Sequence, residues 1–518
     1  MTTLDRSTPW GCFFAVTVLL AGAANAQGQR PTAPSDSARH WRLALADAVA
    51  LALQHNPMLK ARAIDVRMAQ ARVVETSGRD DVVLSAKAAW LTDANQQATG
   101  GLVQNPYDAF QVQTQLVRPL PTGGTIGLQL ESAYTRFRSD RLGPEVPSQW
   151  ITPSIALTLR HPILRGAGTA VARAEQRSAR AQKSVAVLQE EAFLADLLRQ
   201  VCQAYWGLHY ATVEVAVRRA SLDLALEQLR AVQAAMRVGN KPSSASAEVE
   251  VAIAMHRADM LTAEQARRQQ STTLRRLLGL AVGEHDPVFV AADTPTVDRV
   301  EPTVADAMAK AMRRHPDLLA LQQQGRVAAI AAEVAEDGLL PQLDLAVSGG
   351  PTGNADSADA ALSGLFQLSG YQFRASLTFA HPLGRHAATG RAAAARAASQ
   401  RLRWAERDIR DRLRADVVVT VDRVVATRSQ IEVLARATRL AELDLTAARA
   451  RYAAGRAQGF DVLRRQAALA EAQLREARAR VDYVGHRITL EAFTAEILER
   501  IDGTRLGLAR SNDERGRI

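Results

Sequence analysis

The sequence predicts an elongated, internally duplicated α+β membrane protein, in which long coiled-coil helices continue into the strands of a β-barrel. Three observations lead to this fold class: a heptad seam of apolar residues, two sets of strand segments that alternate between polar and apolar residues, and a helix pair that occurs twice. No run of about 18 to 20 apolar residues is present, so helices are not expected to cross a membrane.

The first expected element is a secretory signal peptide over residues 1–26. An apolar run at Phe13–Leu20 is followed by the small residues Ala-Asn-Ala, with cleavage expected after Ala26. Cys12 is removed with this peptide, and it does not stand at the cleavage point, where a lipid-acceptor cysteine would be. Cys202 then remains alone, so no intramolecular disulfide is expected in the exported chain.

The formal net charge of +10 does not indicate nucleic-acid binding. Most of the positive charge comes from arginines that are interspersed with Glu and Asp along helical stretches. Such a mixture is typical of solvated coiled-coil surface.

The repeated helix pair sets the domain organisation. A short amphipathic helix begins at Leu45 and another at Val304, and each leads to a proline, Pro57 or Pro316, that can open a second helix. The first repeat is expected over residues 27–280 and the second over 302–501, with a linker at 281–301. A charged tail over 502–518 is expected to be disordered.

Six segments with strict alternation are expected to be strands. They lie at 82–90, 110–116, 126–131 and 155–159 in the first repeat, and at 343–347 and 371–379 in the second. Glycine-rich and polar stretches at 92–105, 139–149 and 349–370 are expected to be loops. A β-sandwich would alternate in the same way, and the signal peptide and long helices favour the barrel.

In a barrel, the two faces of these strands meet different solvents. The polar side chains are expected to face the lumen: Gln111, Gln113, Gln115, Gln129 and Glu131. The intervening apolar side chains are expected to face lipid: Phe110, Val112, Leu116, Leu128 and Leu130.

Each set of strands is followed by a long helix. Apolar residues recur at alternating spacings of three and four from Leu194 to Met236, interrupted at Arg218. This helix is expected to run from just after Gly168 to just before Gly239, over roughly 100 Å. The second repeat has a similar stripe that ends at Tyr452, followed by a return helix.

The order of these elements resembles the outer-membrane efflux protein (TolC) family over essentially the whole mature chain. The residues that carry the resemblance are the Ala-Asp-Ala helix starts at 46–48 and 305–307, Gly-Leu-Leu-Pro at 338–341, the His-Pro strand exits at 161–162 and 381–382, and the hairpin tips at 237–239 and 452–463. The family usually has two strands in each half, whereas the first half here has four because of an additional hairpin near 107–137.

The resemblance implies a homotrimer with an outer-membrane β-barrel that is continuous with a periplasmic α-helical barrel. Its partners would be outer-membrane lipid, a periplasmic adaptor protein and an inner-membrane pump of RND or ABC type, in drug, metal or polypeptide export. It also implies a periplasmic gate at Tyr452, Asp461 and Arg464. The tips implied to dock the adaptor are Val238, Gly239, Gly455 and Arg456.

No enzyme, cofactor or metal site is expected. The loop Gly166–Gly168 lacks the third glycine and the βαβ context of a dinucleotide site. Cys202, Trp206 and His209 lie on one helix without further ligands, which favours packing over metal binding. Two functions remain open: an efflux or type I secretion channel, and a periplasmic coiled-coil structural or adaptor protein outside the membrane.

Overall fold

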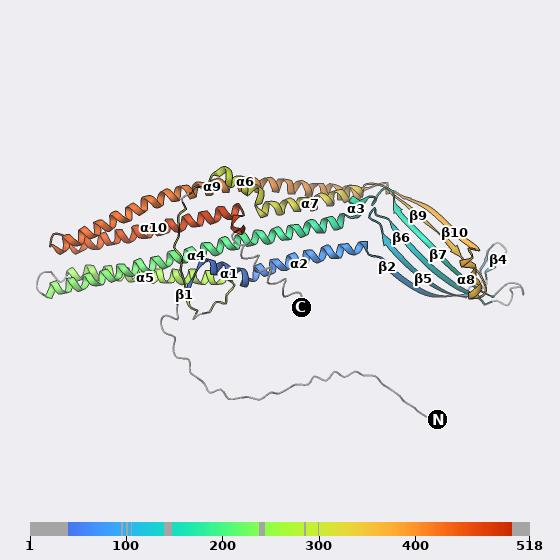
Figure 1. The fold of residues 1–518 in the computed structure, drawn as a ribbon, viewed down its shortest axis with the longest axis horizontal. Helices are drawn as coiled ribbons and strands as arrows, with labels where there is room; N and C mark the ends of the chain where they lie inside the picture. The colour runs from blue at the N-terminus through green and yellow to red at the C-terminus, as the bar shows by residue number, and fades with distance from the viewer. Residues whose placement is uncertain are drawn as a thin grey trace, which may run out of the picture.

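The molecule is elongated, with helices over most of its length and a sheet at one end (Figure 1). The computed structural model describes residues 40–94, 97–99, 102–104, 106–138, 148–237, 244–283, 286–298 and 300–499. In these parts of the chain, none of the helices combines the length and apolar character that crossing a membrane requires. The predicted signal peptide and tail lie outside the described residues.

Both halves of the chain begin with the predicted pair of helices. They are α1 (Leu45–His55) and α2 (Pro57–Ser77) in the first half, and α6 (Val304–Arg314) and α7 (Pro316–Asp337) in the second. Asn56 stands between α1 and α2, and its side chain accepts the backbone N–H groups of Met58 and Leu59. Because Pro57 has no N–H to satisfy, the sequence Asn-Pro is well suited to starting a helix.

The long helices form two hairpins that lie beside each other. The first hairpin is α4 (Ala174–Arg237) and α5 (Ser244–Leu277), preceded by the single turn α3 (Thr169–Ala172); the second is α9 (His386–Ala453) and α10 (Gly459–Phe493). The 64 residues of α4 span about 96 Å. Its predicted seam is confirmed, since nine of the seam residues are buried: Leu194, Leu197, Val201, Ala204, Leu208, Ala211, Val215, Ala225 and Val232.

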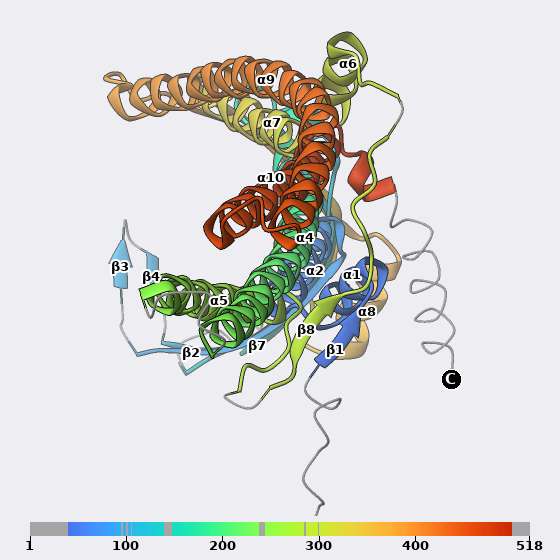
Figure 2. The ribbon, with the colours of Figure 1, turned by 90° about the vertical axis from the view of Figure 1, so that its left-hand side faces the viewer.

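Arg218, which interrupts the seam, is accommodated by the return helix. Its guanidinium group lies 3.0 Å from the carboxylate of Asp259 on α5. The two hairpins also contact each other, because the buried Gln466 side chain on α10 donates to the backbone carbonyl of Ser221 on α4. Viewed from the hairpin tips, the helices form a curved wall that is open on one side (Figure 2).

All six predicted strands are confirmed, and they form one antiparallel sheet. Its order is β10-β9-β7-β6-β5-β2. The strands are β2 (Val83–Asp93), β5 (Tyr107–Pro119), β6 (Thr125–Phe137), β7 (Gln149–Pro162), β9 (Gln342–Thr352) and β10 (Gly370–Ala380). The additional hairpin β5–β6 lies between β2 and β7, so it belongs to the same continuous sheet as the other four strands.

Several short elements were not predicted. The short helix η2 (Gly78–Asp80) follows α2, and β3 (Gln97–Thr99) pairs with β4 (Leu102–Gln104) in a small hairpin. The expected loop at 349–370 is wrong in part, because β9 continues to Thr352 and α8 (Ala358–Phe366) follows it. The helix α8 buries Ala361 and Leu365, which gives this glycine-containing stretch an apolar contact.

The predicted linker between the halves contains a strand. There, β8 (Val288–Ala291) pairs in parallel with β1 (His40–Leu43). This pair packs on the middle of α4 through Tyr205, whose hydroxyl lies 3.0 Å from the Leu43 carbonyl oxygen and 2.8 Å from the Asp293 carboxylate. The same hydroxyl accepts the backbone N–H groups of Ala292 and Asp293. Tyr205 therefore anchors β1 and the linker to the helices.

Candidate functional site

One face of the sheet gathers the polar side chains that the sequence placed in a lumen. The register sets Gln113 opposite Lys87 and Glu131, and it sets Gln115 opposite Gln129. The Glu131 carboxylate accepts hydrogen bonds from the side-chain amides of Gln111 and Gln129, the second at 3.0 Å. The five predicted residues thus lie together on one side of β5 and β6.

The opposite face is apolar and exposed. The rings of Trp90 and Phe110 lie 6.1 Å apart on paired strands, and Leu128 stands between Leu116 and Leu157 in neighbouring strands. Large side chains on this face keep much of their surface uncovered, including Val112 at 38%, Leu157 at 58% and Phe373 at 70%. Exposed apolar surface on this scale is unusual for a protein that meets only water.

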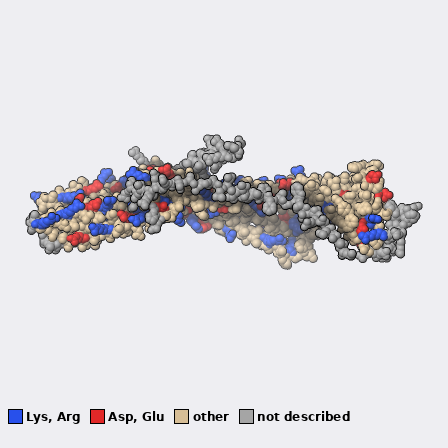
Figure 3. All heavy atoms as spheres, turned by 90° about the horizontal axis from the view of Figure 1, so that it is seen from below, with Lys and Arg blue, Asp and Glu red and all other residues tan. Residues whose placement is uncertain are grey.

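Charged side chains are more frequent on the helical part of the molecule than on the sheet. In the view of Figure 3, Lys and Arg alternate with Asp and Glu over the helical part, whereas the sheet part is mostly uncharged apart from a small group near its far end. Arg138 contacts the Asp108 carboxylate at one end of β5 and β6. Lys87 and Glu131, which lie near the middle of their strands, belong to the polar face.

The tip of the second hairpin is a tight turn. Gly455 has a φ of +71°, its N–H donates to the Tyr452 carbonyl, and the Arg456 N–H donates to the Arg451 carbonyl at 2.8 Å. A glycine in the left-handed region is a common end of a helix. A Cβ atom at Gly455 would meet no atom within 4 Å, so the predicted tip is open to solvent. Val238 and Gly239, at the tip of the first hairpin, lie outside the described residues.

A groove of about 1560 Å³ lies between the two hairpins near their tips. Tyr452 and Arg464 line it on one side, and Met255 of α5 lines it on the other. Met255 and the nearby Phe460 are 65% and 60% exposed. The groove therefore offers apolar side chains that neither hairpin covers.

The predicted gate residues have different local roles. Asp461 completes a capping box at the start of α10, in which its carboxylate accepts the Gln458 backbone N–H. The next arginine, Arg465, lies 2.8 Å from Asp444 of α9. Tyr452 and Arg464 both line the groove, whereas Asp461 is held at the helix start beside them. The gate itself stays a prediction, since it would form between copies of the chain.

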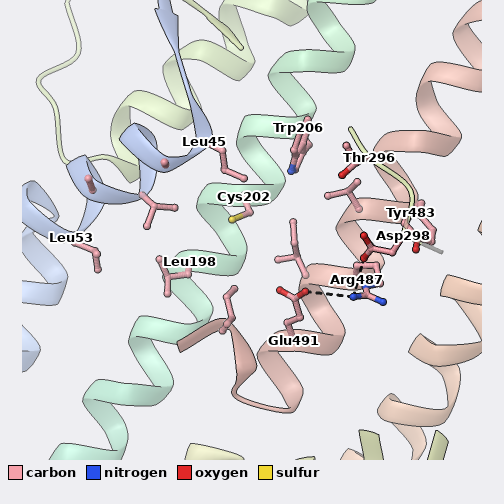
Figure 4. Close-up of a pocket in the computed structure, with 16 residues that line it drawn as sticks. Leu45, Leu53, Leu198, Cys202, Trp206, Thr296, Asp298, Tyr483, Arg487 and Glu491 are labelled. Carbon is pink, nitrogen blue, oxygen red and sulfur yellow. Dashed lines mark ion pairs between the residues drawn. The ribbon is translucent and has the colours of Figure 1, made fainter. Parts of the chain in front are cut away.

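A separate cavity of about 440 Å³ lies beside the middle of α4. Figure 4 shows that Cys202 and Trp206 of α4 line it together with Leu45 of α1 and with Arg487 and Glu491 of α10. Arg487 lies 3.0 Å from Asp298 and 4.0 Å from Glu491. Periodicity could not reveal this cavity, because four separate segments of the chain line it.

Within the described ranges, the side chains around this cavity form no candidate metal centre. Among the residues that the structure describes, no cluster of three His, Cys, Asp or Glu side chains could hold a metal ion. His209 packs edge-on against Trp206, and burial lowers the pKa of its imidazole. The side chain of His209 is therefore packed against that of Trp206 on the same helix.

Solved outer-membrane channels share this fold. The channel OprN is 13% identical, with a TM-score of 0.63, and the match covers 87% of this chain and 89% of that chain. VceC of Vibrio cholerae is 16% identical, with a TM-score of 0.59 and coverages of 87% and 95%. The open state of MtrE of Neisseria gonorrhoeae is also 16% identical, with a TM-score of 0.59 and coverages of 87% and 88%. No curated protein matches the sequence.

The fold is thus that of the outer-membrane channel proteins. Residues 307–496 match the model of the outer membrane efflux protein family. Together, the family match and the shared fold confirm the resemblance that the order of the sequence elements indicated.

Proposed function

We propose that three copies of this internally duplicated chain form a passive channel in the outer membrane. The sheet would lie in the membrane and the helices in the periplasm. There the helices would meet an adaptor protein and, through it, an inner-membrane pump of RND or ABC type. The channel would serve a tripartite efflux or type I secretion system, and the pump would select the cargo.

The two unlike faces of the six-stranded sheet carry this proposal. The Gln-rich face suits water, and the face that includes Val112, Leu157 and Phe373 suits hydrocarbon. A periplasmic structural or adaptor protein, the second candidate, has no need of so much uncovered apolar surface on a sheet.

The shape of the helical part supports an assembly of several copies. A single copy forms a curved wall with one open side, as Figure 2 shows, and α4 alone is about 96 Å long. Curved walls of this kind enclose a tunnel when identical copies are arranged around an axis. The groove between the hairpin tips, with Met255 and Phe460 uncovered, is then the surface at which we place the adaptor.

Fractionation of expressing cells tests the proposal against the second candidate. The channel is expected in the outer-membrane fraction, and without heating it should migrate in a detergent gel as an oligomer that heat converts to a monomer. A known periplasmic protein serves as the control for leakage. Recovery of the chain in the soluble periplasmic extract, as a species that heating does not change, would support the coiled-coil alternative and reject the channel.

A further inference from the structure

The sheet ends in two edge strands of equal length. Both β2 and β10 have eleven residues, and in the described part of the chain each pairs with one other strand, β5 and β9 respectively. The outer edge of each therefore presents backbone N–H and C=O groups that no strand of the same sheet satisfies. Such edges are tolerable in water but costly in hydrocarbon, where every backbone polar group needs a partner.

The two edges have the right direction to pair with each other in neighbouring copies. All five pairings within the sheet are antiparallel, so β2 and β10 run in opposite directions. A contact between β2 of one copy and β10 of the next is head-to-tail, and a head-to-tail contact closes into a ring when the rotation between copies permits it.

The stagger between neighbouring strands gives the tilt that the strands would have in a closed barrel. Pairing leads from Val83 of β2 through Val117, Gly127, Thr158 and Ser348 to Arg374 of β10. Arg374 lies six residues from Ala380, the end of β10 on the side of the helices, whereas Val83 is the first residue of β2 on that side (Figure 1). With the ends of β2 and β10 aligned between copies, this stagger of six residues of about 3.3 Å extends over six strand spacings of about 4.8 Å, which corresponds to a tilt of about 35°. Transmembrane barrels have tilts of about 35 to 45°.

The side chains of the two edges also match. When β2 and β10 are aligned over their full length in opposite directions, Leu84 stands opposite Phe379 and Trp90 opposite Phe373. Both pairs join apolar residues that are largely exposed in the single copy. A shift of one residue would set the apolar side chains of one strand beside the polar side chains of the other. Because side chains alternate between the two faces, only shifts by an even number of residues keep the faces matched.

We infer that β2 of each copy pairs with β10 of the next, and that the trimer closes a barrel of eighteen strands. The inference rests on the proposed function, from which the number of copies comes, and on the six strands that each copy contributes. The β5–β6 hairpin supplies two of the six, since it lies between β2 and β7 and cannot leave the sheet without breaking it.

The strand number sets the width of the exit. Eighteen strands that are about 4.8 Å apart and tilted by about 35° have a backbone radius of about 17 Å, against about 11 Å for the twelve strands that three copies would have without the hairpin. The added hairpin therefore increases the cross-section about twofold. Its inward face would be polar and Gln-rich, as Gln111, Gln113 and Gln129 indicate.

Cysteine cross-linking in outer membranes tests the predicted contact. The full-length register sets Ala88 of one copy opposite Ala375 of the next, and both side chains are small enough for replacement by cysteine. The double variant Ala88→Cys, Ala375→Cys is expected to give covalent dimers and trimers on oxidation, which reducing agent converts to monomers. The single variants should stay monomeric on a heated gel, and Ala88→Cys with Phe379→Cys serves as the out-of-register control.

The strand count is then measured by electron microscopy of the purified unmodified protein. Eighteen strands with the β2–β10 contact support the inference. A membrane-embedded oligomer with twelve strands, or one in which only the out-of-register pair cross-links, overturns the inference and leaves the channel function intact. A soluble monomer without any cross-link overturns the proposed function as well.

Discussion

Replacing Val112 with arginine tests which solvent the apolar face of the sheet meets. Val112 is the sixth of the thirteen residues of β5, so it would lie near the middle of the membrane. An arginine that faces lipid at this depth costs about 2 to 4 kcal/mol, and one near the membrane surface about 0 to 1 kcal/mol. Gln113 is the matched control, because it is the next residue on the same strand and faces Lys87 and Glu131 on the polar side.

The assay is denaturant-induced unfolding of the protein from lipid vesicles, followed by the conversion of folded to unfolded migration on a gel. Val112→Arg should lower the free energy of unfolding by about 2 to 4 kcal/mol per copy. Gln113→Arg should change it by less than about 0.5 kcal/mol, as is usual for a solvated position. Equal effects of the two variants, or a larger effect at Gln113, would refute the assignment of the two faces.

Three further predictions concern packing, the central anchor and the gate. A Cβ atom at Gly350 would collide with the Ile155 carbonyl oxygen, so Gly350→Ala should lower the free energy of unfolding by roughly 1 to 3 kcal/mol. A Cβ atom at Gly325 on α7 would meet open space, so Gly325→Ala should raise it by about 0.5 to 1 kcal/mol. Tyr205→Phe should cost about 1 to 3 kcal/mol at neutral pH, because it removes the hydroxyl that bonds the Leu43 carbonyl and the Asp293 carboxylate. Burial raises the pKa of Tyr205 from 10.0 to about 12. The stability that the neutral hydroxyl contributes is therefore complete below pH 10 and is lost as the pH rises from 10 to 12. A pH series of melting temperatures should show this loss in the wild type and not in the phenylalanine variant. Finally, Arg464→Asp should raise cation selectivity in bilayer recordings, and an unchanged reversal potential together with an unchanged conductance would reject a role for Arg464 at the entrance.

Elements with a clear period could be predicted from the sequence. The seam of α4 and the six strands could be predicted because their apolar residues recur over many residues, and Pro316 was predicted as the start of the helix that is α7. The strands β1 and β8 have four residues each, which is too short for a period to show. Their position depends instead on contacts with Tyr205, which is far away in the sequence.

The candidate site was predictable to the same extent. Alternation placed Gln111, Gln129 and Glu131 on one face, but it could not reveal that the two glutamines donate to the same carboxylate, which depends on the register of β5 and β6. Family resemblance indicated Asp461 as a gate residue, and the structure adds that its carboxylate caps α10. A capping role arises from the local turn, which the resemblance did not reveal.

The most direct test of the channel is the pattern of cysteine labelling along β5 in intact outer-membrane vesicles. Single cysteines are placed at each position and treated with a water-soluble or a lipid-soluble maleimide. The account predicts labelling by the lipid-soluble reagent at Phe110, Val112 and Leu116, and labelling by the water-soluble reagent at Gln111, Gln113 and Gln115. Labelling of Gln113 by the lipid-soluble reagent while Val112 is spared, or water-soluble labelling at every position, would contradict it.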